Sequence, residues 1–219
     1  MEEKKGFHRA WLVFIGVCMM MAGGMGLVLN VIGNYFVPIT VALGLLTPQG
    51  TPDVMAVSFL MTVYSYVMLV WLPIVGRLFN KIDARILFGA GGISIVAGVL
   101  LLGVWTEVWQ IYISGVLWGL GGPMIFLVGP SYLINNWFSA SQAGKFLGIA
   151  SAFTGVGTFV WSPTFAGLIL NMGYQTALFI EAAVAAVLIL IPAFFFFRNR
   201  PEDVGLQPFG IEKERAAGD

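Results

Sequence analysis

Two asparagines and a tyrosine lie close together in a long apolar run near the start of the chain: Asn30, Asn34 and Tyr35. Because residues four apart share one side of a helix, Asn30 and Asn34 would present their amides along one face. Polar groups at membrane depth are costly and usually face the bundle interior or a water-filled cavity. The pattern predicts either a solute-binding face or hydrogen bonds between helices, and we favour the solute-binding face.

Glu181 is the one acidic residue that stands well inside an apolar run. A carboxyl group at such a position is a candidate for coupling proton movement to transport. It comes only about two turns after the run begins. We therefore expect its side chain to extend to the water interface, and we favour this structural role over coupling.

Four aromatic residues in the apolar runs could also contact a solute: Tyr64, Trp118, Tyr132 and Trp161. Aromatic side chains in a helical bundle more often pack against neighbours or lie at the membrane interface. Both roles stay open for these four residues. No Lys or Arg lies inside any of the runs, so the sequence provides no cation at membrane depth for an anionic solute.

The composition explains why these polar residues are rare. Of the 219 residues, 58% are hydrophobic and 10% are charged, and the mean hydropathy is +0.89. A soluble domain would have about a quarter of its residues charged, which excludes a soluble globule. Continuous apolar runs of about 20 residues predict membrane-spanning helices and an all-α polytopic membrane protein. We expect six spans: Ala10–Val37, Val54–Val75, Ile86–Val104, Trp109–Ile134, Phe146–Leu170 and Tyr174–Phe197.

All 11 Lys and Arg residues fall in four segments. These segments precede span one, join spans two and three, join spans four and five, and follow span six. With six spans they all lie on one side, and the positive-inside rule predicts that both termini are cytoplasmic in an inner (plasma) membrane. The expected organisation is a tail at 1–9, a bundle at 10–197 and a second cytoplasmic tail at 198–219. The single Cys18 excludes an intrachain disulfide.

The connector between spans two and three, GRLFNKIDAR at 76–85, resembles a signature of the major facilitator superfamily at that place. Asn80 stands where the family usually has Asp. Gly76 would permit two helix ends to approach closely, and we expect Asp83 to cap the third helix rather than to act in gating. The residues that represent this conformational-loop signature are Gly76, Arg77, Leu78, Asn80, Lys81, Asp83 and Arg85.

Four later stretches strengthen the resemblance and narrow it to the branch of oxalate/formate antiporters and monocarboxylate porters. They are NNWFSASQAGKFLGIASAFTGVG from 135, SPTFAG from 162, GYQTALF from 173 and RPEDVGLQPFG from 200. The resemblance implies half of a transporter, built as two inverted three-helix repeats that bind solute near the bilayer midplane. It also implies alternating access, a small organic anion such as a mono- or dicarboxylate, and a partner that is a second six-helix half or another copy.

Three interpretations stay open. The chain is the amino-terminal half of a longer protein, or a half-size protein that pairs with itself or with a separate half, or a different six-helix protein. A membrane enzyme is disfavoured, because the only histidine is His8 and the spans lack a metal-binding cluster. We expect no metal, no cofactor and no nucleic-acid partner. The competing function is that of a non-transporting membrane interaction protein or a truncated fragment.

Overall fold

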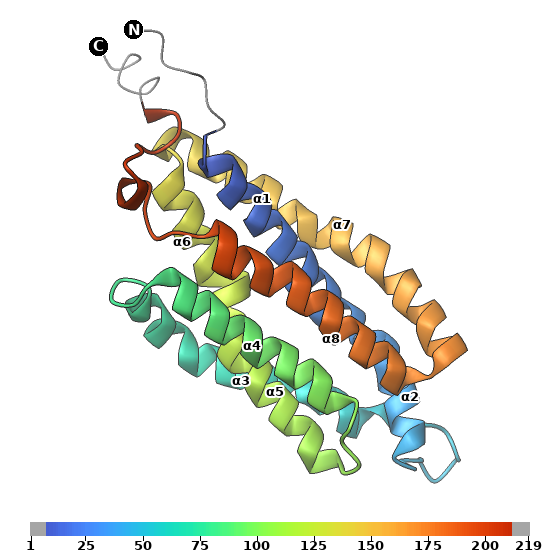
Figure 1. Cartoon of the computed structure of the whole chain (residues 1–219). Helices are drawn as coiled ribbons and strands as arrows, with labels where there is room; N and C mark the ends of the chain where they lie inside the picture. The colour runs from blue at the N-terminus through green and yellow to red at the C-terminus, as the bar shows by residue number, and fades with distance from the viewer. Residues whose placement is uncertain (1–7, 212–219) are drawn as a thin grey trace, which may run out of the picture.

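The computed structural model describes residues 8–211 of the chain. Within this range six helices are long and apolar enough to cross a membrane (Figure 1). This confirms the all-α fold and the six predicted spans, although span one continues to Ala42 instead of ending at Val37 and span five begins at Ala140 instead of Phe146. The spans run Ala10–Ala42, Val54–Leu78, Ala84–Leu102, Val108–Trp137, Ala140–Met172 and Tyr174–Phe196, and are numbered one to six below.

Spans one and four share an irregularity that the other long spans lack in their central parts. Each contains a π-helical segment, at Met21–Leu29 in span one and at Pro123–Leu127 in span four. These two segments pack against each other. The regular helices are α1 (Ala10–Met20), α2 (Gly33–Ala42), α3 (Val54–Leu78), α4 (Ala84–Leu102), α5 (Val108–Gly122), α6 (Val128–Trp137), α7 (Ala140–Met172) and α8 (Tyr174–Ile191), which ends in a π turn at Pro192–Phe196.

Spans one and four each pack mainly with two spans from the other half of the sequence. Span one packs mainly with spans five and six, and span four packs mainly with spans two and three. Figure 1 shows these two layers, with α1, α7 and α8 in one and α3, α4 and α5 in the other. Spans three and six join the layers through the contact of α4 with α8. This reciprocal arrangement agrees with two inverted three-helix repeats.

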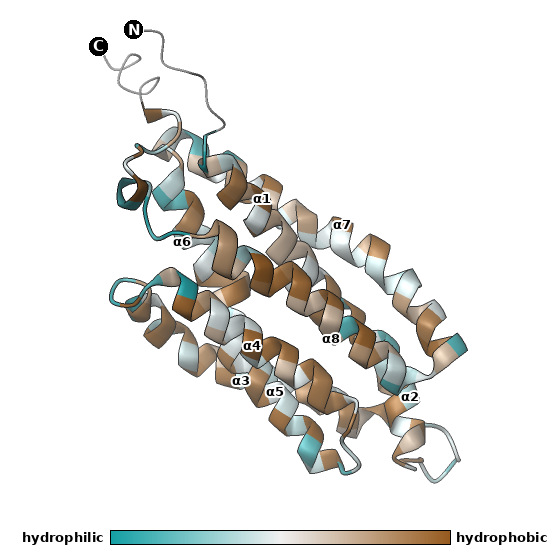
Figure 2. Cartoon of the chain, viewed as in Figure 1, coloured by the Kyte–Doolittle hydropathy of each residue, from teal (hydrophilic) through white to brown (hydrophobic). Residues whose placement is uncertain are grey.

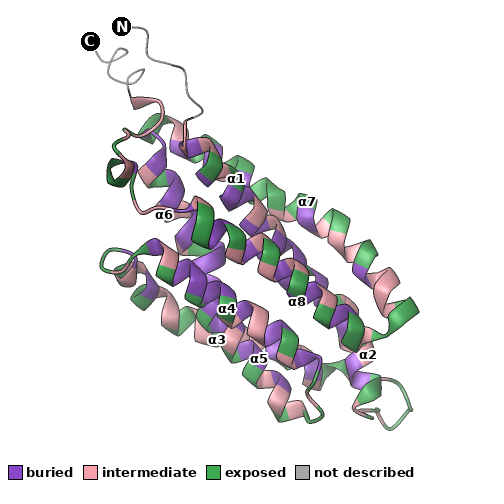
Figure 3. Ribbon diagram, in the orientation of Figure 1, coloured by how far each residue is buried: buried purple, intermediate pink, exposed green. Residues whose placement is uncertain are grey.

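Spans two and five are far less covered than spans one and four. In the most apolar 18 residues of each span, 11% are buried in spans two and five, against 61% in spans one and four. Figure 3 shows exposed residues running along α7, and Figure 2 shows that the long helices are mainly hydrophobic with polar residues near their ends. The bundle therefore has a covered centre and two open flanking helices.

Glycine allows the closest contacts between spans. A Cβ on Gly157 of α7 would lie 2.6 Å from the carbonyl oxygen of Ala22 in span one. A Cβ on Gly121 of span four would lie 2.5 Å from the carbonyl oxygen of Gly91 in span three. Both contacts are to backbone atoms, so they need a residue without a side chain and fix how closely the helices can approach.

The segment after span six folds back over one end of the bundle. The backbone N–H of Ala84 donates to the side-chain oxygen of Asn199 at 2.6 Å, and the indole of Trp137 donates to the carbonyl of Arg198 at 3.0 Å. The backbone of Phe209 also hydrogen-bonds to Trp137 and Ser139. These contacts place three of the four basic segments at one end of the molecule. Lys4, Lys5, Lys213 and Arg215 lie outside the described residues.

Candidate functional site

Asn30 and Asn34 lie on the side of span one that faces α7. The Asn30 amide donates to the hydroxyl of Thr158 at 2.7 Å, and the Asn34 amide donates to the carbonyl of Ser162 at 3.0 Å. Asn30 is exposed and Asn34 is half-buried. A primary amide has two donor hydrogens and two acceptor positions, so one such bond leaves capacity for a solute. The asparagines can therefore pack the bundle and bind solute at the same time.

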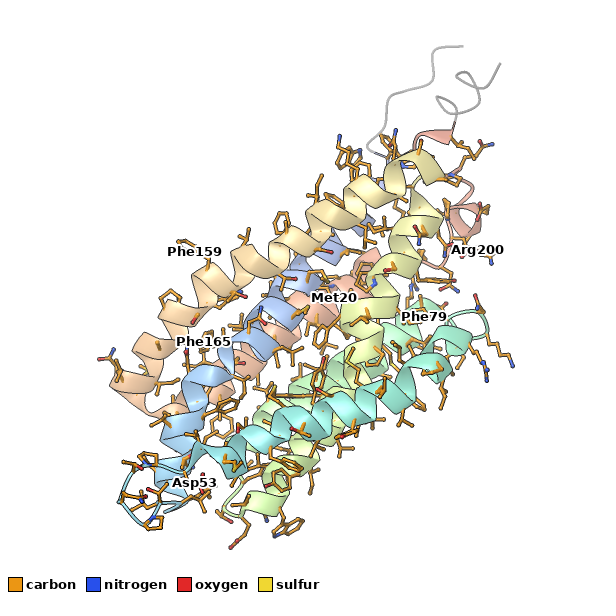
Figure 4. The ribbon with its side chains drawn as sticks, turned by 180° about the vertical axis from the view of Figure 1, so that it is seen from behind. Met20, Asp53, Phe79, Phe159, Phe165 and Arg200 are labelled. Atoms are coloured by element: carbon orange, nitrogen blue, oxygen red, sulfur yellow. The ribbon has the colours of Figure 1, made fainter. Side chains whose placement is uncertain are left out.

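These asparagines follow directly after the π-helical segment of span one. That segment ends at Leu29 and contacts the matching segment of span four at the centre of the bundle. Figure 4 shows this side of the molecule, with spans one and four in the middle and α3 and α7 at the flanks. π-Helical turns often occur at functional sites, because they widen the helix and redirect side chains. The fold thus places the two amides centrally on the side bordered by the open helices.

Span two, the flanking helix opposite α7, also contributes polar groups. Tyr64 is half-buried, and its ring lies 3.1 Å from the Cβ position of Gly122 in span four. A hollow of about 360 Å³ lies on the exposed side of α3, lined by Met61, Thr62, Ser65, Tyr66 and Leu69. Thr62 and Ser65 are not among the candidates predicted from the sequence. Their spacing along one helical face was the signal that could have identified them.

The structure does not bring all of the aromatic candidates to this side. Trp118 is 1% exposed and donates its indole N–H to the carbonyl of Ile95 at 3.2 Å, between spans three and four. Tyr132 packs against Phe79 beside the connector, with ring centroids 5.0 Å apart and the rings tilted by 39°. These two side chains serve packing in this conformation.

Trp161 lies on α7, away from both Trp118 and Tyr132. It lines an apolar groove of about 350 Å³ formed by α1, α7 and Leu188 of α8. Figure 4 shows how α7 divides its side chains: Phe159, 82% exposed, points outward, whereas Phe165 is buried toward span one. Asn30, Asn34 and Tyr64 therefore remain as the candidates that adjoin the central side of the bundle.

Tyr35 and Glu181 form a buried polar pair away from that side. Tyr35 is fully buried and Glu181 is 1% exposed, so the expectation that Glu181 extends to the water interface is wrong. The physical reason is that span one continues to Ala42, and its last helix, α2, packs against α8.

The two polar groups of this pair are neighbours, with the Tyr35 hydroxyl beside the Glu181 carboxyl. Neither the hydroxyl nor Oε2 of Glu181 makes a hydrogen bond of standard geometry to the described residues. An unpaired buried polar group costs about 1–3 kcal/mol, which favours pairing of these two groups with each other.

The connector at 76–85 has mainly structural contacts. Asp83 caps α4 by accepting from the backbone N–H of Arg85 at 2.9 Å, as expected. Asn80 donates to the carbonyl of Gly76 at 3.3 Å. A Cβ on Gly76 would meet no described atom within 4 Å, so the predicted close approach of helix ends at this glycine is not observed.

Three charged residues of the connector, Lys81, Asp83 and Arg85, face the segment after span six. The Arg85 side chain donates through Nε to the carbonyl of Phe197 at 2.9 Å. A polar hollow of about 270 Å³ separates connector and segment, and Lys81 and Asp83 line it together with Arg200 and Asp203. Arg77 and Lys81 are exposed, and Leu78 is half-buried. Asn80, Lys81, Asp83 and Arg85 of the signature thus border the segment that follows the sixth span.

Comparison with known proteins identifies the family. The model of the Major Facilitator Superfamily matches residues 12–211. The chain belongs to the major facilitator superfamily. Its relatives include a sugar phosphate exchanger 3 of Xenopus laevis, 26% identical over 185 residues, which cover 78% of this chain and 35% of the relative.

Two further relatives show the range of the family. A monocarboxylate transporter 13 of Rattus norvegicus is 25% identical over 147 residues, covering 67% of this chain and 31% of the relative. An MFS-type transporter of a Phoma species is 25% identical over 120 residues, covering 54% of this chain and 42% of the relative. This major facilitator chain thus aligns with only 31% to 42% of the length of these relatives.

Proposed function

We propose that this chain forms one six-helix half of a secondary transporter that carries a small organic anion by alternating access. The observation that carries the proposal is the contrast between its covered and open spans. Spans one and four are 61% buried in their most apolar parts and lie centrally, whereas spans two and five are only 11% buried. A second six-helix unit placed against the open helices would enclose a solute site near the bilayer midplane.

The proposed substrate class is a mono- or dicarboxylate. Two relatives are named as a sugar phosphate exchanger and a monocarboxylate transporter, and both names describe organic anions. The Lys and Arg residues within the spans, Arg77, Arg85 and Lys145, all lie near span ends, so the spans place no cation at membrane depth. The proposal therefore assigns amide and hydroxyl contacts to Asn30, Asn34 and Tyr64, and assigns the attracting cation to the second unit.

The proposed partner is a second six-helix half or another copy of this chain, in addition to the lipid bilayer and the solute. The basic connector and the segment after span six share one end of the bundle. The positive-inside rule supports placing this end in the cytoplasm, in an inner or plasma membrane. We propose transport as the function, and catalysis has no role in this mechanism.

Counterflow in proteoliposomes tests the proposal. Vesicles that contain the chain with its partner unit would be loaded with unlabelled oxalate, lactate, glycerol phosphate or a neutral sugar, and the uptake of the labelled compound would be measured. We expect saturable exchange of at least one organic anion and none of the neutral sugar. Exchange restricted to neutral solutes would overturn the substrate class.

Matched variants identify the contribution of the central amides. Asn34→Ala should reduce exchange, because it removes the amide beside Ser162. Asn171→Ala is the control, since the Asn171 amide bonds only to Gly167 within its own helix. Equal exchange by both variants would remove Asn34 from the proposed site. A stable complex without exchange of any anion would favour the alternative of a non-transporting interaction protein.

A further inference from the structure

The outer part of span one, α2 at Gly33–Ala42, is separated from the regular first part of its helix by irregular turns. The regular α-helical pattern is interrupted by the π-helical segment at Met21–Leu29 and again at Ile32. Pro38 lies inside α2 and removes one backbone donor. Kinks and altered helical pitch at such places allow one part of a helix to move relative to the other. The position of α2 therefore depends on its side-chain contacts with other spans.

Two adjacent residues provide such contacts in different directions. Asn34 donates to the carbonyl of Ser162 on α7 at 3.0 Å. Tyr35 is turned by about 100° around the helix from Asn34, and its hydroxyl lies beside the Glu181 carboxyl of α8. Figure 1 shows α2 beside the end of α8 at which that helix begins. The outer part of span one thus contacts spans five and six through these side chains, and it also packs against α3 of span two.

No cation accompanies Glu181 among the described residues. Its helix packs against α1, the π-helical segment, α2, α4 and α7. The charged residues of these elements are Arg85 and Lys145, which lie at the starts of α4 and α7, at the opposite end of the bundle from Glu181. Cys18 of α1 is the other titratable group on these elements, and Tyr35 is the titratable group that neighbours the Glu181 carboxyl.

We propose that Glu181 and Tyr35 act as a proton-dependent latch that fixes the outer part of span one against span six. In the closed latch the neutral acid and the hydroxyl are paired in a site that excludes water. Loss of the proton to water leaves a carboxylate with a single donor and no cation, which such a site does not accommodate. Water must then enter, and α2 separates from α8.

Glu181 is a positioning residue in this scheme, because it acts on the central amides through Tyr35. Release of Tyr35 frees α2, and Asn34 on the same turn then changes its position relative to α7. The inference concerns the conformation of this chain, so it holds whether or not the solute is an organic anion. A failure of the transport assay would leave it unaffected.

A spin label on α2 tests the latch. The label would be attached at Val37→Cys, an exposed position on α2, in a Cys18→Ala background. Its mobility would be measured by electron paramagnetic resonance in lipid nanodiscs from about pH 5 to pH 9, a range in which buried carboxyl groups are able to titrate. A second label at Leu170→Cys on α7, 86% exposed, is the control for changes unrelated to the latch.

We expect the ratio of mobile to immobile label at Val37 to rise about fivefold between the lowest and the highest pH. This is the effect of losing one hydrogen bond, here the one between Tyr35 and Glu181. Glu181→Gln cannot ionise and should keep the label immobile at every pH. Tyr35→Phe should raise the mobile fraction already at low pH and reduce the further change. The label at Leu170 should not respond.

Three results would overturn the latch. The first is a mobility of the Val37 label that does not change across the pH range. The second is a pH response of this label in Glu181→Gln equal to that without the substitution. The third is a pH response of the Leu170 label equal to that of the Val37 label. If Glu181→Gln does not elute as a folded species, Tyr35→Phe decides the matter alone. A Phe variant with the same immobile label and the same pH response as the unsubstituted chain would contradict the proposed pairing.

Discussion

Gly157→Ala should destabilise the bundle at the contact between spans one and five. The added Cβ would lie 2.6 Å from the carbonyl oxygen and 2.9 Å from the Cα of Ala22. Both are backbone atoms of a packed helix, so no side-chain rotation can relieve the overlap. Gly155→Ala is a matched control in the same helix, because a Cβ at Gly155 would meet no described atom within 4 Å.

The difference between the two variants isolates the packing effect. Each replacement gains about 1 kcal/mol of helix propensity, and this gain cancels in the comparison. Overpacking costs about 1–3 kcal/mol, which should therefore be the difference in the free energy of unfolding between the variants. For a chain of this length the corresponding difference in melting temperature is about 2–12 °C.

Thermal unfolding of both variants in the same mild detergent, followed by intrinsic fluorescence, provides the measurement. We expect Gly155→Ala to melt at or slightly above the temperature of the unsubstituted chain and Gly157→Ala to melt below it. Equal melting temperatures for the two variants would refute the close packing of span one against α7. The placement of Asn30 and Asn34 beside α7 would then also lose its support.

Three further changes test other contacts. Asn199→Ala removes the acceptor for the backbone N–H of Ala84 and should lower stability by about 1 kcal/mol, measured by thermal unfolding. Trp137→Phe removes the hydrogen bond to the Arg198 carbonyl, so limited trypsin digestion after Arg198 should be several-fold faster than in the unsubstituted chain. Asn34→Ala should decrease anion counterflow while thermal unfolding changes by no more than about 1 kcal/mol.

The sequence was sufficient to predict the number of spans and the general fold. Long apolar runs determine helices in a membrane directly, because every backbone polar group must be satisfied within the segment. The cap formed by Asp83 was also predictable, since a short acidic side chain before a helix can accept from its first free N–H groups. These features depend on local sequence, which explains their success.

The depth and direction of single side chains were less predictable. Glu181 comes soon after span six begins, yet it is buried because the far end of span one extends over it. Trp118 is buried because Gly98 of span three leaves room for its indole ring. Both outcomes depend on which residues of distant helices meet, and this information is absent from the pattern of a single span.

The most direct test of the central claim is counterflow of a labelled small organic anion in proteoliposomes made from two fractions of known mass. One fraction would contain the chain as a monomer, and the other the chain associated with a second six-helix unit. We predict saturable exchange by the associated fraction and none by the monomer, because only the associated form covers the open helices α3 and α7. Saturable exchange by the monomer at the same rate would contradict the claim that this chain is one half of a transport pathway.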